Sequence, residues 1–431
     1  MAEQHGKALV PQIRFAGFTD PWEQRKLGEV ARRVTRKNEN RDSDLPLTIS
    51  AQYGLVDQRT FFNNQVASKD MSGYFLLRKG EFAYNKSTST DSPWGAIKRL
   101  EKYDMGCVST LYICFELLSG DPDFLVTYYE TDRWYKAVQL IAAEGARNHG
   151  LLNIAPDDFF ETQICIPKRI DEQRQIGAFF DRLDSLITLH QRKYDKLCVL
   201  KKSMLDKMFP KGGSLYPEIR FAGFTDPWEQ RKLGEVATFG GGHTPSMSDS
   251  DNYEGGNVLW VTSQDVKSHY LDGTTTQITE KGAKELTLYP AGSLVMVTRS
   301  GILRHTLPVA ELRKPSTVNQ DIRVILPQEN YYGQWLLQFF ISRNKELLLE
   351  FGKTGTTVES VDFSKMRDMV LLTPSLPEQQ QIGRYFARLD NLITLHQRKY
   401  CGVVSWMLGV ALVRLGSESD GAFGEMKHVL R

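Results

Sequence analysis

The stretch Pro11–Ala31, PQIRFAGFTDPWEQRKLGEVA, decides the architecture of this chain because it occurs twice. Its second copy, Pro217–Ala237, reads PEIRFAGFTDPWEQRKLGEVA and differs at one of 21 positions. Another pair of segments recurs at the same offset of 206 residues. Glu172–Tyr194 (EQRQIGAFFDRLDSLITLHQRKY) and Glu378–Tyr400 (EQQQIGRYFARLDNLITLHQRKY) are identical at 18 of 23 positions. The chain is therefore two copies of one plan.

We call the first repeated segment the framing block, the second the framing helix, and the segments between them the inserts. The inserts, 32–170 and 238–376, look unrelated at the matching offset. A chain that keeps its frame and changes its inserts is suited to present two different recognition surfaces on one scaffold. Long identical coding stretches are also substrates for homologous recombination. We therefore hypothesise that the inserts are exchangeable cassettes.

Composition sets the broad class. A length of 431 residues predicts two or three domains, and 41% hydrophobic with 25% charged residues is ordinary for a folded chain. The net charge of +2 argues against non-specific coating of nucleic acid, although local basic patches remain possible. The five cysteines form no CxxC pair and no His/Cys ligand spacing, which indicates reduced thiols in a cytosolic protein.

Neither end of the chain indicates export or a membrane. Met1–Lys7 leads directly into a polar stretch that contains proline, without the features of a signal peptide. The most apolar run, Val403–Leu415, is 13 residues long and too short to span a bilayer. We expect a cytoplasmic protein.

The framing helix gives the clearest local signal. Alternating steps of four and three from Ile176 reach ten positions up to Met208, eight of them apolar or aromatic. This is a heptad seam sustained for more than four heptads. Pro167 precedes the segment and Pro210 follows it, as start and stop signals do. The spacing predicts a helix over 171–208, about 57 Å long at ~1.5 Å per residue.

The second copy repeats the seam, so the two helices can pair within one chain as an antiparallel coiled coil. An antiparallel pair would set the two inserts at opposite ends. The expected interface residues are Ile176, Phe180, Leu183, Ile187, Tyr194 and Leu197 in the first helix, and Ile382, Phe386, Leu389, Ile393 and Tyr400 in the second. His190 and His396 also lie on the seam, where we expect packed or paired histidines rather than metal ligands.

The inserts have the pattern of mixed α/β domains. In the first, strand-like runs occur at 74–77, 81–84, 108–115 and 163–166, and a helix is expected at 123–143. In the second, such runs occur at 258–262, 293–298, 322–326 and 369–372, and a helix is expected at 332–350. The expected fold class is α/β (α+β): two globular domains separated by a long antiparallel coiled coil, with a pseudo-twofold repeat. The expected domain bounds are 1–166, 167–215, 216–372 and 373–431.

Catalytic motifs are missing from the sequence. Gly352-Lys353-Thr354 lacks the glycine of a Walker loop, because Leu347 stands at that position. No Asn-Pro-Pro or Asp-Pro-Pro-Tyr/Phe methyl-transfer motif occurs, and Asp20-Pro21-Trp22 is duplicated at 226–228 as part of the scaffold. The run Gly240–Gly242 is not a dinucleotide fingerprint. We expect no catalytic residue and no metal site.

This arrangement resembles the specificity subunit of type I restriction–modification systems over about residues 11–400. In both copies, a strand ending in proline leads into Glu-Gln at the start of the framing helix. The residues that carry the resemblance are Ile164–Pro167 with Glu172, Gln173 and Ile176; Leu371–Pro374 with Glu378, Gln379 and Ile382; and Gly241–Ser246 and Gly352–Thr357 in the second insert.

The resemblance implies two target-recognition domains, each reading one half of a split, asymmetric site in double-stranded DNA. It also implies a non-catalytic subunit that docks two modification (methyltransferase) subunits and, through them, restriction (motor-nuclease) subunits. The holoenzyme chemistry so implied uses S-adenosylmethionine, ATP and Mg²⁺, none of which has a visible site in this chain. The alternatives are a free-standing nuclease or methyltransferase, which the missing motifs disfavour, and a structural coiled-coil spacer with two protein-binding lobes.

DNA reading needs Lys or Arg for phosphates and Asn, Gln, Arg, Ser or Thr for base edges. Several clusters of these types fall on expected loops, although each alone could be a solvated loop. The candidate DNA-binding residues are Asn85, Lys86, Ser87, Lys98, Arg99, Arg147, Asn148 and His149 in the first insert, and Thr244, Ser246, Arg299, Arg304, Asn319, Gln320, Lys353 and Thr356 in the second.

The second framing helix departs from the first after Tyr400. Gly402 and Gly409 each weaken a helix by roughly 1 kcal/mol relative to alanine. The lysines at 196, 201 and 202 have no counterpart, and the polar segment 416–421 is expected to fray. We therefore expect the distal half of the coiled coil to be weakened.

Overall fold

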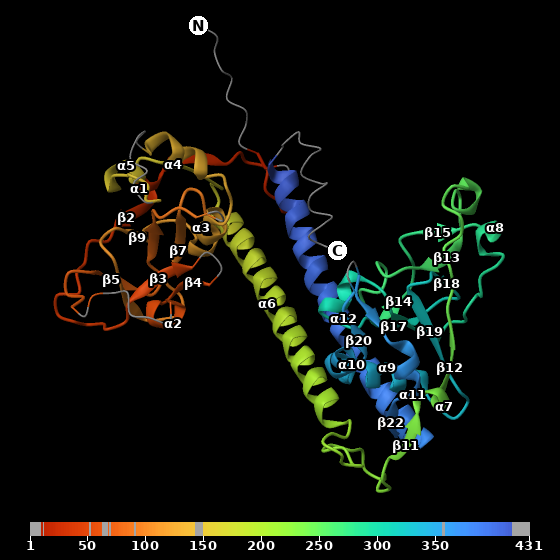
Figure 1. Ribbon diagram of the computed structural model, residues 1–431. Helices are drawn as coiled ribbons and strands as arrows, with labels where there is room; N and C mark the ends of the chain where they lie inside the picture. Colours follow the sequence, from red (N-terminus) through yellow and green to blue (C-terminus); the bar gives the residue numbers. More distant parts are fainter. Residues whose placement is uncertain are drawn as a thin grey trace. The chain divides into compact units, whose positions relative to one another are not determined.

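The computed structural model describes residues 10–415 except 12, 51–52, 63–67, 69, 90–91, 143–149 and 356–357, with side chains up to residue 399. The chain forms two compact units (Figure 1). The first holds residues 1–189 together with 401–431, and the second holds residues 190–400. Each framing helix thus contributes to both units.

The first unit is built on a four-stranded sheet in the order β2-β9-β6-β7, accompanied by the strand pairs β1-β10, β3-β4 and β5-β8. The helices of the insert pack on this sheet and share one core with the framing block. Its elements are β1 (Glu23–Lys26), α1 (Leu27–Val30), β2 (Ala31–Arg33), β3 (Leu47–Ser50), β4 (Gly54–Asp57), α2 (Gln58–Phe62), β5 (Phe75–Arg78), β6 (Phe82–Asn85), β7 (Ala96–Arg99), β8 (Met105–Val108), β9 (Ile113–Leu117), α3 (Pro122–Tyr129), α4 (Tyr135–Ile141), α5 (Pro156–Phe160), β10 (Gln163–Ile166) and the start of α6 (Ile170–Lys207).

The second unit holds a five-stranded sheet in the order β12-β19-β16-β17-β14 and a three-stranded sheet in the order β15-β13-β18. The pairs β11-β22 and β20-β21 complete it. Its elements are the end of α6, β11 (Glu229–Lys232), α7 (Leu233–Val236), β12 (Ala237–Gly240), η1 (Ser250–Asn252), β13 (Val258–Val261), β14 (Tyr270–Leu271), β15 (Gln277–Ile278), α8 (Glu280–Ala283), β16 (Leu294–Val297), η2 (Gly301–Arg304), β17 (Val309–Leu312), β18 (Thr317–Val318), β19 (Ile322–Pro327), α9 (Gly333–Ser342), α10 (Asn344–Phe351), β20 (Gly352–Lys353), β21 (Ser360–Val361), α11 (Phe363–Asp368), β22 (Val370–Thr373) and the start of α12 (Leu376–Leu415).

The mixed α/β class is confirmed, but three expected elements are each divided in two. The run 108–115 belongs to β8 and β9, which are separated by the turn at 109–112. The helix expected at 123–143 is α3 and α4, because buried Trp134 turns back and donates its Nε1–H to the carbonyl of Tyr129 at 3.0 Å. The helix expected at 332–350 breaks at Arg343, whose guanidinium donates to the carbonyl of Pro210.

The repeated segments fasten to each other in the same way in both units. Strand β1 pairs antiparallel with β10, and β11 pairs antiparallel with β22. Beside the first pair, Arg14 donates two hydrogen bonds to the carboxylate of Glu172, at 2.6 and 2.7 Å. Beside the second, Arg220 does the same to Glu378, at 2.7 and 2.8 Å. In each unit, the framing block is therefore bound to the first turn of the framing helix by a strand pair and an ion pair.

The glutamine after each of these glutamates ties the insert to the frame. Gln173 donates to the carbonyl of Pro167 at 2.8 Å and accepts from the backbone N–H of Asp121, also at 2.8 Å. Gln379 repeats both bonds with Pro374 and Tyr332. The insert supplies only a backbone amide to this contact, so its side-chain sequence is free to vary.

A glycine in each framing helix allows an insert helix to approach closely. A Cβ added at Gly177 would lie 2.7 Å from the backbone nitrogen of Phe124 in α3. One added at Gly383 would lie 3.0 Å from the backbone nitrogen of Trp335 in α9. The first distance is shorter than real Cβ contacts show and the second is at that limit, which explains why the framing helix carries Ile-Gly at this position in both copies.

Within the second unit, the end of α6 packs antiparallel against the start of α12. His190 lies beside His396, Lys201 beside Asp390, and the Phe209 ring near the Phe386 ring. Partner numbers fall on one helix as they rise on the other, so the expected packing of the two helices is confirmed and its direction here is antiparallel. The seam residues Leu183, Ile187, Tyr194, Leu197 and Ile393 are half-buried, whereas most of their helical neighbours are exposed.

The first position of each seam also lies in the core of a recognition domain. Ile176 is buried in the core of the first insert, together with Phe124 and Ile164. Its counterpart Ile382 is buried in a core of the second unit that also contains Leu205 and Met208 near the end of α6. The same apolar stripe therefore serves the recognition domain at the start of each framing helix.

The distal helix is continuous across its two glycines. Its backbone remains helical through Gly402 and Gly409 to Leu415. The side chain of Tyr400 and the segment 416–421 lie outside what the structure describes. Cys107 and Cys114 are buried free thiols, which agrees with the expected reduced state. Among the described residues, no helix is long and apolar enough to cross a bilayer.

The histidine pair makes the contact of α6 with α12 sensitive to pH. The Nδ1 atoms of His190 and His396 lie 3.0 Å apart, so one ring must be neutral to accept a hydrogen bond. Desolvation, with the charges of His190, Lys193 and Lys399, lowers the pKa of His396 below its ordinary 6.5. A lowered histidine pKa means that the folded state binds the proton more weakly than the unfolded chain. The pair's contribution to stability is therefore complete above pH 6.5 and is lost as the pH falls below it.

We predict that acidification from about pH 7.5 to about pH 5 destabilises the chain through this pair. The measurement is the melting temperature of the intact chain, of His396→Asn and of His305→Asn, a matched change at an exposed histidine. His396→Asn should lose part of the acid-induced fall in melting temperature, whereas His305→Asn should keep it. Equal falls in all three proteins would contradict the prediction.

Candidate nucleic-acid interface

Candidate residues from separate segments of the second insert meet at one end of the five-stranded sheet. The Thr244 hydroxyl donates to Oε1 of Gln320 at 2.6 Å. Thr298, directly after β16, donates its backbone N–H and its hydroxyl to the carbonyl of Asp321, at 2.8 and 3.1 Å. Segments about 244, 298 and 320, which are far apart in sequence, therefore form one surface.

The hairpin formed by β20 and β21 joins the same surface. Arg299 forms a β-bridge with Ser360, and the backbone N–H of Ser300 donates to the carbonyl of Glu359 at 3.1 Å. Lys353 lies in β20 of this hairpin, while Thr356 lies outside the described residues. The structure thus brings four of the sequence's candidate segments together.

The glycine run Gly240–Gly242 has a steric role in this assembly. A Cβ at Gly242 would overlap the carbonyl oxygen of Val318, and one at Gly241 would lie 2.6 Å from the Arg323 guanidinium. The backbone of this segment therefore passes directly over the turn that presents Gln320. The Tyr289 hydroxyl fixes the segment, donating to the Gly241 carbonyl and accepting from its N–H, both at 2.8 Å.

The cations at this surface differ in how far they are neutralised. Arg304 pairs with Glu359, and Lys353 pairs with Asp362 at 2.8 Å. The hydrogen bonds from these cations hold the pKa of each carboxylate below its ordinary value, so both pairs stay ionised. Arg299 is exposed and forms no ion pair with any side chain that the structure describes.

Two further candidates of the second insert serve the local fold. Asn319 is buried, and its Oδ1 accepts the backbone N–H of Asp321 at 3.1 Å, which holds the turn that exposes Gln320. Ser246 is exposed and its hydroxyl lies 2.9 Å from that of Ser248. Gln320 and Arg299 are therefore the candidates best placed to reach an external ligand.

In the first insert, the Asn85–Ser87 segment lies against the stretch that follows the Arg147 loop. Lys86 donates its Nζ to the carbonyl of Ile154 at 3.1 Å, and Ser87 forms a β-bridge with Leu151. Desolvation lowers the pKa of Lys86. Arg147, Asn148 and His149 themselves lie outside the described residues.

Lys98 and Arg99 are separated from that group. The register of β6 with β7 pairs Asn85 with Ala96 and Phe82 with Arg99, so Lys98 and Arg99 lie toward the opposite end of the hairpin. Carboxylates also engage both cations: Lys98 pairs with Glu130 in the loop after α3, and Arg99 pairs with Asp123 at 2.6 Å. The sequence grouped these residues because it shows spacing along the chain but not strand register.

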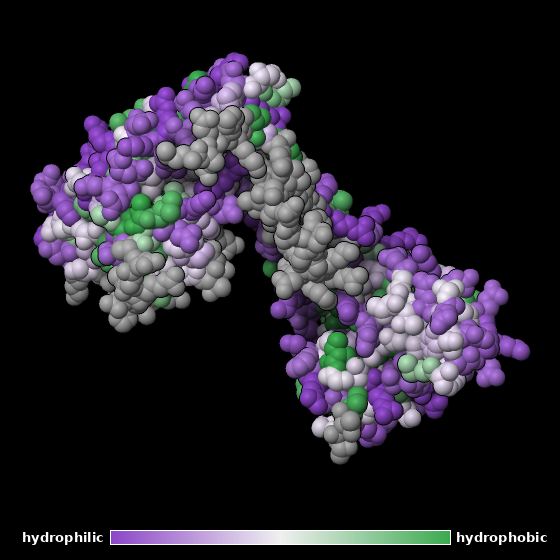
Figure 2. Space-filling view, turned by 90° about the horizontal axis from the view of Figure 1, so that it is seen from above, coloured by the Kyte–Doolittle hydropathy of each residue, from purple (hydrophilic) through white to green (hydrophobic). Residues whose placement is uncertain are grey.

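Sequence reasoning missed the Arg14–Glu172 and Arg220–Glu378 pairs. The signal was available, because both pairs recur at the offset of 206. In the part of the chain with described side chains, no group of three or more His, Cys, Asp or Glu residues could hold a metal ion. On the face seen in Figure 2, hydrophobic residues form separate spots on a mostly hydrophilic surface.

Comparison with known proteins finds a family that matches the second half of the repeat. Residues 225–402 match the family described as "Type I restriction modification DNA specificity domain". This match takes in less than half of the chain, so the likeness to this family is shown for residues 225–402. The matched range contains the second insert, both of its junctions with the frame and the surface around Gln320.

Curated relatives match part of this chain. It is 32% identical over 166 residues to the EcoR124I/EcoR124II specificity subunit of Escherichia coli, a match that covers 38% of this chain and 41% of that protein. It is 29% identical over 171 residues to the MjaIX specificity subunit of Methanocaldococcus jannaschii, covering 38% of each chain. The matches thus span about two fifths of these relatives' lengths.

A solved structure extends the likeness in fold to nearly the whole chain. The S subunit of a type I restriction–modification system from M. genitalium has a TM-score of 0.55 at 13% identity. The alignment covers 95% of this chain and 100% of that one. At this identity the likeness concerns the fold alone.

We predict that Gly242→Ala destabilises the second unit, because a methyl group there would meet the Val318 backbone rather than a movable side chain. Overpacking of this kind costs about 1–3 kcal/mol. Thermal unfolding should show a lower melting temperature than in the matched variant Gly301→Ala, where a Cβ would meet no atom within 4 Å. Equal melting temperatures would contradict the close approach.

Proposed function

We propose that this chain is a specificity subunit of a type I restriction–modification system and that it recognises a bipartite, asymmetric site in double-stranded DNA, with each insert reading one half. The observation that carries the proposal is a duplicated frame that holds two unrelated inserts, of which the second collects polar residues from four segments onto one surface. Two equal inserts would read a symmetric site, whereas two different inserts suit an asymmetric one.

The chemistry of the second surface suits base reading more than phosphate binding. Gln320 offers an amide that can pair with adenine, and Arg299 offers a fork of donors that can pair with guanine or phosphate. Most neighbouring cations are already paired with carboxylates. In the first insert, Asn85, Lys86 and the Arg147–His149 loop remain the proposed contacts.

The proposal includes partners that carry the chemistry. Two modification subunits would dock on the duplicated frame, and restriction subunits would join through them. S-adenosylmethionine, ATP and Mg²⁺ would bind to those subunits, since this chain contributes recognition and spacing. A complex that acts on cellular DNA in this way would lie in the cytoplasm.

Exchange of an insert tests the proposal. Residues 32–166 are replaced by the corresponding insert of another specificity subunit, and DNA from cells that also express the modification partner is mapped for methylation. We predict that one half of the methylated sequence changes while the other half and the spacing remain. The control is the exchange of 238–372, which should change the other half. A change in both halves from either exchange would exclude two independent readers.

Point variants test the surface itself. We predict that Arg299→Ala, if Arg299 pairs with a base, loses about 1–3 kcal/mol of discrimination against the wrong base. The control is Lys314→Ala, an exposed cation that follows β17 at the other end of the same sheet. Affinities for cognate and altered duplexes are measured with the modification partner over a range of salt. The surface is misassigned if both variants behave as the unmodified chain does.

A further inference from the structure

The end of α6 is held in a socket within the second unit. The Phe209 ring is 3% exposed and lies among three aromatic rings, with centroids 6.0 Å from Trp228, 6.4 Å from Phe339 and 6.5 Å from Phe386. The framing block also grips the helix backbone, because the N–H of Ile219 donates to the carbonyl of Lys207 at 3.0 Å.

A charged contact two turns earlier orients the same helix end. Nζ of Lys201 lies 2.6 Å from Oδ1 of Asp390, and both side chains are 11% exposed. The hydroxyl of Tyr270 donates to Oδ2 of Asp390 at 3.1 Å. Both carboxylate oxygens are therefore engaged. The socket accepts a helix end with lysine at one position and phenylalanine eight residues later.

The first unit contains a counterpart of this socket. Trp22 corresponds to Trp228 by the offset of 206. Tyr128 corresponds to Phe339, because each follows by seven residues the backbone amide that binds the framing glutamine. The aromatic contacts also recur: Phe15 meets Phe179 at 5.5 Å and 78°, and Phe221 meets Tyr385 at 5.7 Å and 76°.

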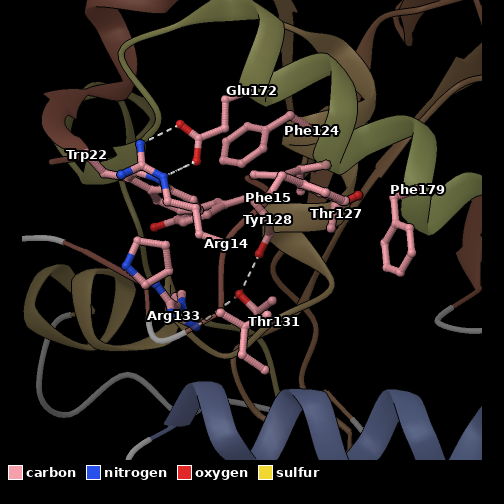
Figure 3. A pocket seen from close by; sticks show the side chains of 13 residues that line it. Arg14, Phe15, Trp22, Phe124, Thr127, Tyr128, Thr131, Arg133, Glu172 and Phe179 are labelled. Carbon is pink, nitrogen blue, oxygen red and sulfur yellow. Dashed lines mark hydrogen bonds and ion pairs between the residues drawn. The ribbon is translucent and has the colours of Figure 1, made fainter. Parts of the chain in front are cut away.

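The counterpart surrounds a cavity of about 320 Å³. Figure 3 shows side chains of the framing block, α3 and α6 facing this hollow, among them Trp22, Tyr128 and Phe179. Nη1 of Arg14, which also lines the cavity, is buried and has no hydrogen-bond partner among the described residues. The C-terminal end of a helix in this cavity would pack apolar side chains against the rings. Its last carbonyl groups, which have no partner within the helix, would accept a hydrogen bond from this N–H.

The charged part of the socket is also duplicated, but its cation is missing from the described residues. Asp184 corresponds to Asp390 and forms no ion pair with any described side chain. Asp184 is exposed, and desolvation with the nearby carboxylates Glu130 and Asp181 raises its pKa, an effect that nearby Lys98 partly offsets. Lys98 is itself paired with Glu130, so the excess of carboxylates here favours the arrival of a further cation.

The repeat indicates which helix end would occupy the cavity of the first unit. The backbone of α12 continues to Leu415, and residues from Cys401 on group with the first unit. At the offset of 206, Met407 stands in place of Lys201 and Leu415 in place of Phe209. We propose that the end of α12 docks in the first unit's socket in this register, with residue 407 opposite Asp184 and residue 415 in the aromatic cavity, and that Met407 and Leu415 fill it incompletely.

The test restores the two missing groups in the full chain. Met407→Lys and Leu415→Phe should each raise the melting temperature by about 2–4 °C. The gain from Met407→Lys should disappear when Asp184→Asn is added. Matched controls are Leu408→Lys and Leu412→Phe, whose counterparts Lys202 and Asp206 are exposed. These controls should give no gain.

A chemical readout separates docking from general stabilisation. Carbodiimide joins an amine to a carboxylate only when the two are in contact, and peptide mass spectrometry locates the bond. The Lys201–Asp390 link serves as an internal standard in every sample. Met407→Lys should add a link between position 407 and Asp184, and Leu408→Lys should not. The proposal is overturned if the standard forms but the 407–184 link does not, or if the controls stabilise as much as the test variants.

Discussion

The bidentate ion pair between the framing block and the framing helix is the contact on which the rest of each unit depends. Arg14 is 10% exposed and Glu172 is 1% exposed in the first unit, and the values for Arg220 and Glu378 are 14% and 1%. Removing one partner of such a pair leaves an uncompensated buried charge, which costs about 3–5 kcal/mol. Sequence separation makes the contact more important, because it joins residues 158 positions apart and encloses the whole insert between them.

This contact explains how one frame holds two unrelated inserts. The frame supplies the side chains, namely arginine, glutamate and glutamine, while the insert supplies a backbone N–H and one strand edge. Every insert has backbone N–H groups, whatever its sequence. An insert therefore only has to place one of them within hydrogen-bonding distance of the framing glutamine. The insert must also supply a helix that packs closely against the framing helix at Gly177 or Gly383. The repeat is therefore nearly identical because its side chains make the contacts, and the inserts differ because theirs do not.

The sequence predicted what is periodic or repeated and missed what depends on register. The framing helix expected at 171–208 is α6 at Ile170–Lys207, and the expected strand at 163–166 is β10. Lys98 and Arg99 were grouped with Asn85–Ser87, whereas strand register sets them apart, and α3 with its following loop brings carboxylates to both. The meeting of Thr244, Thr298 and Gln320 also depends on strand order, in which β16 lies beside β19. Short strands of two residues, such as β18, carry no periodic signal that could have indicated this.

The balance of charge at the candidate surface bears on how such a subunit could bind DNA. The chain carries a net charge of only +2, and carboxylates of the second insert neutralise Arg304 and Lys353. Affinity from phosphate contacts grows with the number of cations that release counterions, so a surface with few unpaired cations gains little from this source. Under the proposed function, sequence discrimination would come from polar groups such as Gln320, and most of the salt-dependent affinity would come from the docked subunits. The other subunits of the complex would then supply both catalysis and most of the affinity for DNA. This chain would set which sequence is read and how far apart the two halves of the DNA site lie.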